Sequence, residues 1–131
     1  NMFATTFFAV LSPATGELTY VNAGHEKPII VGNVLRHLET TGPAMGLMAG
    51  PGFQTRRITL DRGETLVSVT DGVTEAKGPS GFYGEERLLQ LLRPGRSAAD
   101  LAGDVKSALD AHVAGEDPHD DVTLLVLRRT A

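Results

Sequence analysis

The sequence has 131 residues, which is the length of one domain and enough to bury a hydrophobic core without disulfides or structural metals. Hydrophobic residues make up 41% and charged residues 21%, so the composition is that of an ordinary globular protein. The formal net charge is −4 and no basic stripe is present, which argues against nucleic acid as a partner. The absence of cysteine excludes disulfides and thiolate chemistry.

The sequence contains no apolar run near the roughly 20 residues that cross a bilayer. Its first residues also lack the basic start of a signal peptide. We therefore expect a cytoplasmic protein with no membrane partner. The chain opens on Asn1 and enters a strand pattern almost at once, so we interpret Asn1 as a cut point inside a longer protein.

The first 70 residues have the pattern of an antiparallel β-meander, with no helix between the strands. Turn residues separate the segments, and Gly32-Asn33 is predicted to form a two-residue hairpin turn. Residues 40–52 are rich in Gly and Pro and are expected to form a loop. The predicted strands are 5–11, 17–22, 28–31, 34–38, 53–60 and 64–70.

Two helices are predicted after the meander. Residues 85–92 carry four leucines and end before Pro94. Ser97 followed by Asp100 resembles a capping box, and Gly115 fits the end of the helix that this cap would open. The apolar stripe of that helix consists of Leu101, Val105, Ala108, Leu109 and His112.

A nearly continuous apolar strand at 122–127 closes the chain and is of the kind that lies in the middle of a sheet. The order of elements predicts an α+β fold with helices packed on a sheet. We expect one domain over residues 1–131, with the meander at 5–70, the helical pair at 84–114 and the closing strand at 122–128.

Two acidic sites stand where predicted strands end or begin. Asp71 directly follows the strand at 64–70, and Gly72 lets the backbone approach whatever Asp71 holds. The pair Asp120-Asp121 precedes the last strand, so the two sites meet if these strands are neighbours. Crowded carboxylates repel, and Mg²⁺, Mn²⁺ or Ca²⁺ relieves the repulsion through oxygen ligands. The alternatives are a polar turn at Asp71-Gly72 and a solvated loop end at Asp120-Asp121.

Other candidate residues lie nearby in the sequence or at similar positions. If a helical turn begins at Asp71, Glu75 lies on the same side of it, although a first-turn Glu is also favoured by the helix dipole alone. His25, next to Gly24 at another strand end, is a candidate for lining a site. The histidines expected to be structural or solvated are His37, His112 and His119.

A set of short segments covers nearly the whole chain and is specific as an ordered set. It comprises residues 7–8, 11–18, 20–25, 42–47, 63–66, 70–76, 82–84 and 120–124. In this order the segments resemble the PPM (type 2C) metal-dependent Ser/Thr protein phosphatases, and more closely their bacterial stage II sporulation E and sigma-B-regulator branch. The resemblance rests above all on Thr70-Asp71-Gly72 and on Asp120-Asp121 before the last strand.

The resemblance implies an α-β-β-α fold in which two antiparallel sheets form a sandwich flanked by helices. It also implies a centre of two Mn²⁺ or Mg²⁺ ions, with Asp71 and Asp120 as catalytic metal ligands. Such ions lower the pKa of a bridging water and orient it for in-line attack on phosphorus, without a covalent phosphoenzyme. The expected partner is a phosphoprotein substrate, typically a phosphorylated anti-sigma-factor antagonist.

The same resemblance implies secondary roles for neighbouring residues. Gly72 and Asp121 stand beside the metal ligands, and Glu75 falls where relatives often carry an acid near an additional metal. His25 falls where other branches have an acid, and His25 with the adjacent Gly24 is a candidate for lining the site.

One departure from the family pattern is that the first metal-binding segment, of the type Asp-x-x-Gly-x-Gly, has no counterpart in the sequence. The N-terminal part of the domain is therefore expected to be missing, and the fragment alone should bind metal weakly and have little activity. The alternatives are a catalytically incomplete module for regulation or protein interaction, and an unrelated metal hydrolase. A sheet that lacks a strand exposes an edge, which predicts a homodimer formed through that edge.

Overall fold

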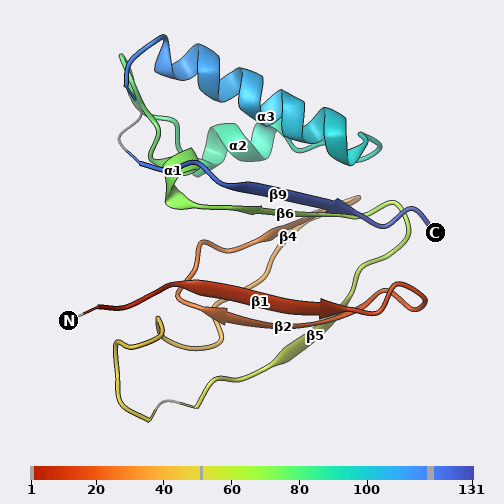
Figure 1. The fold of residues 1–131 in the computed structure, drawn as a ribbon. Helices are drawn as coiled ribbons and strands as arrows, with labels where there is room; N and C mark the ends of the chain where they lie inside the picture. Colours follow the sequence, from red (N-terminus) through yellow and green to blue (C-terminus); the bar gives the residue numbers. More distant parts are fainter. Residues whose placement is uncertain (1, 51, 118–119) are drawn as a thin grey trace.

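Two antiparallel sheets lie face to face, and helices cover the outer face of one of them (Figure 1). The computed structural model describes residues 2–50, 52–117 and 120–131. Within these ranges the layers run from helices through a four-stranded sheet to a three-stranded sheet. The predicted α+β sandwich is confirmed, and the residues described here place helices on one side of it.

The three-stranded sheet consists of β1 (Thr6–Leu11), β2 (Glu17–Ala23) and β5 (Arg56–Thr59), with β2 in the middle. Its strands are rich in Thr, Val and Phe, which favour the pleated backbone. Alternate side chains face the other sheet and form one hydrophobic core together with it. The residues of this sheet that belong to that core are Phe7, Ala9, Leu11, Leu18, Tyr20 and Ile58.

The four-stranded sheet consists of β4 (Leu35–His37), β3 (Ile29–Val31), β6 (Thr65–Val69) and β9 (Leu124–Arg128), in that order across the sheet. All five residues of β6 are buried. This burial has two causes, since β6 has a hydrogen-bonded strand on each edge and a packed layer on each face. The strand that precedes Asp71 is therefore enclosed on all sides, as is its neighbour β3.

The prediction of a single meander is wrong, because the chain changes sheets between β2 and β3, between β4 and β5, and between β5 and β6. The fully buried strands β3 and β6 need an apolar layer on both faces, which one meander cannot supply. The long segment between β4 and β5 provides the length for one of these crossings.

The prediction that the last strand lies in the middle of a sheet is also wrong, because β9 is an edge strand within the described residues. Its Leu124 and Val126 pack toward the helices, while Leu127 packs toward the other sheet. The continuous apolar pattern thus reflects burial of both faces of the strand, whereas its position in the sheet depends on hydrogen bonding along its edges.

Two smaller features also differ from the sequence prediction. The turn between β3 and β4 contains three residues instead of two, because Val31 pairs with Leu35. A short hairpin, β7 (Lys77–Gly78) and β8 (Gly81–Phe82), was not predicted. Strands of two residues are too short to produce a recognisable periodicity.

The helical layer consists of α1 (Asp71–Thr74), α2 (Glu85–Leu91) and α3 (Ala98–Val113). It covers the four-stranded sheet (Figure 1) and builds a second core between sheet and helices. The fully buried or nearly buried residues of this core include Val67, Val73, Leu88, Leu101 and Val105. No helix of the described ranges has the length and apolar character needed to cross a membrane.

The ends of α3 follow the capping chemistry of its sequence. The Asp100 backbone N–H donates to Ser97 Oγ at 3.0 Å, which confirms the predicted N-cap. At the other end the left-handed residue is Ala114, with φ 54°, and Gly115 follows with φ 85°. The helix therefore stops one residue before the predicted glycine.

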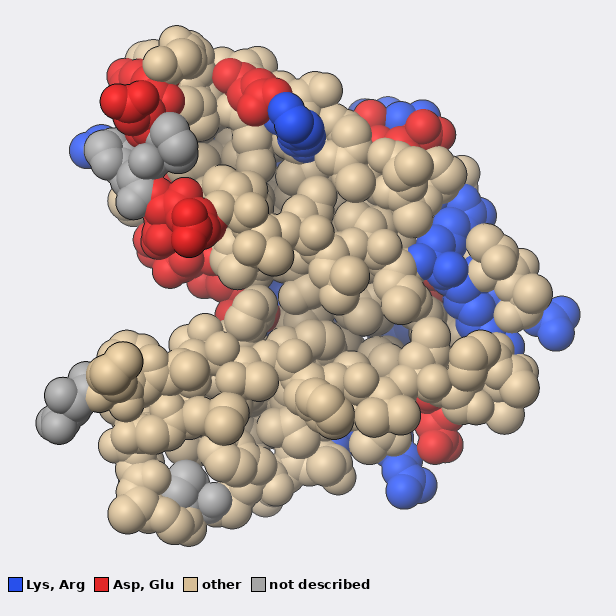
Figure 2. Space-filling model, in the orientation of Figure 1, with Lys and Arg blue, Asp and Glu red and all other residues tan. Residues whose placement is uncertain are grey.

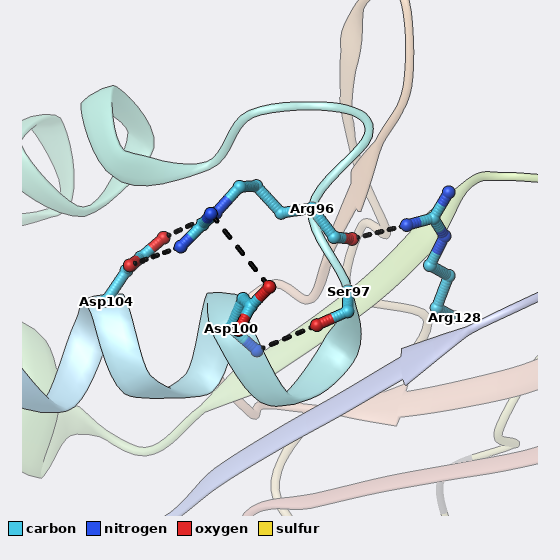
Figure 3. Close-up of polar contacts among 5 residues, drawn as sticks. All are labelled: Arg96, Ser97, Asp100, Asp104 and Arg128. Atoms are coloured by element: carbon cyan, nitrogen blue, oxygen red, sulfur yellow. Dashed lines mark hydrogen bonds and ion pairs between the residues drawn. The ribbon is translucent and has the colours of Figure 1, made fainter.

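An arginine network joins the start of α3 to β9 (Figure 3). Arg96 donates from Nε and Nη2 to the two carboxylate oxygens of Asp104, at 3.0 and 2.8 Å. Arg128 of β9 donates from Nη1 to the Arg96 carbonyl at 2.7 Å. The ion pair with Asp104 holds Arg96 in place. The carbonyl of Arg96 in turn holds β9 through the hydrogen bond from Arg128.

Candidate metal centre and active site

The ends of β6 and β9 lie side by side, as the argument for a metal site requires. Beyond the ladder, the Thr70 N–H donates to the Thr123 carbonyl at 3.1 Å. The Thr123 N–H donates to Thr70 Oγ1 at 3.0 Å, and this hydroxyl donates to the Asp121 carbonyl at 3.4 Å. Asp71 and the segment Asp120-Asp121 are therefore brought together although about 50 residues separate them in the sequence.

Gly72 makes this close approach of the two strand ends sterically feasible. It is buried, and a β-carbon at this position would overlap the carbonyl oxygen of Asp121. The reason for glycine here is thus a close backbone contact rather than an unusual φ. The predicted role of Gly72, to let the backbone approach a group held by Asp71, stays a prediction, since this contact is with the segment before β9.

A helical turn does begin at Asp71, and the Glu75 backbone N–H donates to the Asp71 carbonyl at 2.7 Å. Glu75 is the C-cap residue of α1 and is exposed, as are Asp71 and both residues of the pair Asp120-Asp121. The Asp121 N–H donates to Asp120 Oδ1 at 2.9 Å. The candidate carboxylates are therefore accessible to an ion from solvent.

Charge is distributed unevenly over the molecule (Figure 2). In that view, acidic side chains gather on the side where α1 lies in Figure 1, and basic side chains gather toward the end of β9. Glu26, from the loop after β2, shares the acidic end: burial raises the pKa of its carboxyl, and Asp71 and Glu85 raise it further by repulsion. Glu75 adds to the same effect. Glu26 was not among the residues selected from the sequence.

The loop that carries His25 is shaped by its neighbours. Gly24 has φ +70° and lies so close to Ala44 that a β-carbon would come within 3.0 Å of the Ala44 nitrogen. The His25 N–H donates to Asn22 Oδ1 at 2.9 Å, and its ring Nδ1 lies 2.8 Å from the Glu26 carbonyl. Since a carbonyl only accepts, Nδ1 carries the proton, and His25 is held at the edge of the acidic end.

The other histidines have structural contacts or lie outside the described residues. His37 Nε2 lies 2.8 Å from Glu85 Oε1. His112 Nε2 lies 2.8 Å from the Gly81 carbonyl, and Arg87 Nη1 lies 2.9 Å from His112 Nδ1. The expectation of structural roles for these two agrees with the contacts, and His119 falls outside the described residues.

The carboxylates fit a hard cation in their chemistry but not in their number. Oxygen ligands suit Mg²⁺ and Mn²⁺. Among the described residues, however, no group of three or more His, Asp or Glu side chains is close enough to hold a metal ion. The described residues therefore do not by themselves complete a site for such an ion.

A large groove of about 1110 Å³ opens from this acidic end along α3 and β9. Gly72, Glu75 and Asp120 line its acidic end, and the remainder is mainly apolar. The apolar lining includes Phe82, Val105, Leu109, Val113, Val122 and Leu124. Sequence patterns identified the acids but not the groove, since its walls come from elements far apart in the chain.

The comparison with protein families decides which family this geometry belongs to. The model of the family described as stage II sporulation protein E (SpoIIE) matches residues 1–130. The chain belongs to the SpoIIE family. The resemblance seen in the sequence, to the SpoIIE and sigma-B-regulator branch of the PPM phosphatases, is thereby confirmed.

Two curated SpoIIE-family relatives are similar over 98% of this chain. Protein IcfG of Synechocystis sp. is 38% identical over 132 residues, and the phosphoserine phosphatase RsbU of Bacillus subtilis is 32% identical over 134 residues. The chain spans 21% of the length of IcfG and 40% of the length of RsbU.

A solved structure shows the same fold at low sequence identity. The PP2C phosphatase domain of SpoIIE from Bacillus subtilis, solved with a fragment of its regulatory domain, superposes with a TM-score of 0.77. It is 13% identical, and the match covers 95% of this chain and 37% of that one. A structure of that phosphatase domain presoaked in manganese gives a TM-score of 0.72 at 13% identity, covering 95% and 56% of the two chains.

Proposed function

We propose that this chain is part of a metal-dependent phosphatase domain that hydrolyses phosphoserine and phosphothreonine in proteins. The observation that carries the proposal is the junction of β6 and β9, where Thr70 and Gly72 hold Asp71 against the segment Asp120-Asp121. Membership in the SpoIIE family and similarity to the phosphoserine phosphatase RsbU support it.

The proposed metal ligands in this chain are Asp71 and Asp120, which are also the catalytic residues of the proposal. Asp121 and Glu75 are secondary acids beside them, and Gly72 is the close-packed residue that sets the spacing. The ions are Mn²⁺ or Mg²⁺, which would supply Lewis-acid chemistry for phosphoryl transfer to water. Further ligands come from residues beyond the described set, such as an Asp-x-x-Gly-x-Gly segment in the parent protein.

The role of the chain's own residues is to bring negative charge to one point. The Thr70 hydroxyl accepts the Thr123 N–H and donates to the Asp121 carbonyl, so it resists separation of the ends of β6 and β9. The exposed carboxylates would hold the ion, whose positive charge would offset the negative charge of the phosphate group. This arrangement provides positioning, which is the larger part of what a protein contributes to phosphoryl transfer.

Replacement of Asp71 tests the proposal in the parent protein or its complete phosphatase domain. Because Asp71 is a proposed ligand, Asp71→Asn should lower the Mn²⁺-dependent release of phosphate from a phosphopeptide by about a hundredfold or more. The matched control is Asp61→Asn, in the turn before β6, which should leave this rate unchanged. A wild-type domain without activity, or an Asp71→Asn variant as active as the control, would refute the phosphatase proposal.

The partner in this proposal is a phosphoprotein substrate in the cytoplasm, such as a phosphorylated anti-sigma-factor antagonist. The family resemblance in the sequence is the basis for this substrate class, and similarity to a phosphoserine phosphatase supports the chemistry. The substrate is identified by the loss of phosphate from the candidate antagonist, measured by mass shift after incubation with the parent protein and Mn²⁺.

The second candidate function is a phosphatase-like module for regulation or protein interaction. It is favoured by the lack of a three-acid group among the residues that the structure describes. Calorimetric titration of the parent protein with Mn²⁺ separates the two functions, since a phosphatase binds the ion and an interaction module does not. Loss of this binding in Asp71→Asn would assign the site.

A further inference from the structure

Asn22 is a fully buried polar residue that links two loops at the acidic end. Its N–H donates to Thr41 Oγ1 at 3.0 Å, and its Nδ2 donates to the Leu38 carbonyl at 3.2 Å. Its Oδ1 accepts the His25 N–H at 2.9 Å, and its own carbonyl accepts the Thr41 N–H at 2.8 Å. A buried amide whose partners are all in place fixes their relative positions, so Asn22 sets where the loop after β2 lies.

The loop fixed by Asn22 forms one wall of a second pocket, of about 260 Å³. The pairing of Ile29 with Val67 places the residues just before β3 beside the end of β6, which Asp71 follows. The pocket is smaller than the roughly 300–1,000 Å³ of sites for drug-sized ligands, so its size suits one or two side chains. It is lined by His25, Glu26, Lys27, Thr40 and Glu85.

The charges around this pocket favour a cation. Lys27 also lines the pocket, but its ammonium is paired at 2.9 Å with Glu39, which is not a lining residue. Of the two carboxylates that line the pocket, Glu85 pairs with His37 at 2.8 Å, whereas Glu26 has no ion-pair partner within the described residues. Burial, and then repulsion from Asp71, Glu85 and Glu75, raises the pKa of Glu26, while the neighbouring His25 lowers it. A cationic group that entered the pocket would relieve this repulsion.

We propose that this pocket is the subsite for a Lys or Arg side chain that flanks the phosphorylated residue of the protein substrate. Glu26 is the specificity-determining residue of this subsite, and Asn22 is the positioning residue that holds its wall. The inference rests on the proposed phosphatase function and names the kind of sequence that the site accepts. It requires the substrate chain to pass from the acids at the ends of β6 and β9 toward the loop that precedes β3.

The test uses the complete phosphatase domain with Mn²⁺ and two phosphoserine peptides. The Arg peptide has Arg on both sides of the phosphoserine, and the Glu peptide has Glu at the same positions. The wild-type domain should favour the Arg peptide in kcat/KM by about fivefold, the size expected of a partly exposed ion pair. Glu26→Gln should reduce this ratio toward one, and Glu26→Lys should reverse it. The control Glu86→Lys, on the exposed side of α2, should keep the wild-type ratio.

The outcomes separate the two proposals. No hydrolysis of either peptide by the wild-type domain contradicts the phosphatase function itself. Equal hydrolysis of both peptides, or a ratio that Glu26→Lys and Glu86→Lys change alike, overturns the subsite while the phosphatase function stands.

Asn22 is tested by Asn22→Asp, which keeps the acceptor for His25 and loses the donor to Leu38. Because a positioning residue acts on binding, KM for the Arg peptide should rise to that of the Glu peptide, while kcat stays within about twofold. If circular dichroism shows that this variant does not fold, Thr41→Val serves in its place. The control is Asn33→Asp in an exposed turn, and a fall in kcat with KM unchanged would refute the positioning role.

Discussion

Gly72 occupies the point where the ends of β6 and β9 come closest. A β-carbon there meets the Asp121 carbonyl, which belongs to the backbone and has no rotamer to change. The position therefore links the stability of the sheet to the geometry of the candidate metal centre. Substitution should impair both, whereas substitution of a glycine in open space should impair neither.

Gly72→Ala should lower the free energy of unfolding by about 1–3 kcal/mol, because overpacking forces the two strand ends apart. Gly103→Ala on the exposed side of α3 is the matched control, since no atom lies within 4 Å of a β-carbon there. That change should stabilise the protein by about 0.5–1 kcal/mol, as alanine favours a helix. Chemical denaturation followed by circular dichroism measures both. Equal effects of the two substitutions would refute the packing argument.

Glu26 should make the stability of the protein depend on pH. Its pKa is raised in the folded state from the ordinary value of 4.5, so the folded state holds this proton more tightly than the unfolded state. The stabilisation is complete below the unfolded-state pKa and is lost as the pH rises through the folded-state pKa. At neutral pH the ionised carboxyl is therefore destabilising.

Glu26→Gln should accordingly raise the free energy of unfolding at pH 7 relative to the wild type, and by less at pH 4. Denaturation curves at the two pH values, without added metal, give the difference. In an Asp71→Asn background the gain should be smaller, because Asp71 is the largest charge that raises the Glu26 pKa. A gain that is equal at both pH values would contradict the assignment.

The sequence predicted some of these residues and missed others for a physical reason. Asp71 and the pair Asp120-Asp121 could be selected because each stands next to a strong strand pattern, and strand ends present side chains to solvent. Glu26 carries no such mark. Its importance depends on the pairing of β3 with β6, which brings the loop before β3 near the end of β6, and on its repulsion by Asp71.

Among the elements, α3 is the most completely encoded by its local sequence. Its N-cap, its apolar stripe and its approximate end could all be predicted, because each depends on residues within a few positions of one another. The predicted stop at Gly115 differs by one residue, since the left-handed position falls on Ala114. An L-residue with a side chain pays a conformational cost at such a position.

Ala114→Gly should therefore stabilise the protein by about 1 kcal/mol, because glycine adopts the left-handed conformation without that cost. The matched substitution Ala111→Gly lies inside the same helix and should destabilise it by about 0.5–1 kcal/mol. The signs of the two changes in melting temperature should be opposite. Two changes of the same sign would count against the observed helix end.

The strands show the limit of local prediction. Their positions follow from composition and periodicity, but their partners do not, since hydrogen bonding between distant segments decides which strands pair. The apolar pattern of β9 predicted burial correctly on its two faces and gave the wrong position in the sheet. The two-layer arrangement was predicted from the family resemblance, because the periodicity of a strand does not indicate which sheet the strand joins.

At the scale of the whole molecule, several large apolar side chains remain exposed among the described residues, and those on strands bear most directly on self-association. On the outer face of the three-stranded sheet, Phe8 and Val10 are 64% and 59% exposed. Along the edge strand β9, Leu125 is 52% exposed. An edge strand with apolar side chains is a template for pairing with another chain, and this favours the proposed homodimer through β9.

Leu125→Lys should weaken self-association of the chain, because a charged side chain on an edge strand opposes edge-to-edge pairing. Sedimentation equilibrium over a range of concentrations measures the effect. Val34→Lys, in the exposed turn between β3 and β4, is the control and should leave the association constant unchanged. A wild-type chain that is monomeric at every concentration would exclude the dimer.

Because β6 is enclosed on all sides, its backbone amide hydrogens should exchange slowly with solvent. A strand with neighbours on both edges and packed layers on both faces exchanges its amide hydrogens only when the whole domain unfolds. The segment Asp120-Asp121 belongs to an exposed approach to the edge strand, where local opening is enough for exchange. Asp71 thus follows a slowly exchanging strand by two residues, whereas Asp120 and Asp121 lie in a segment that can adjust around it.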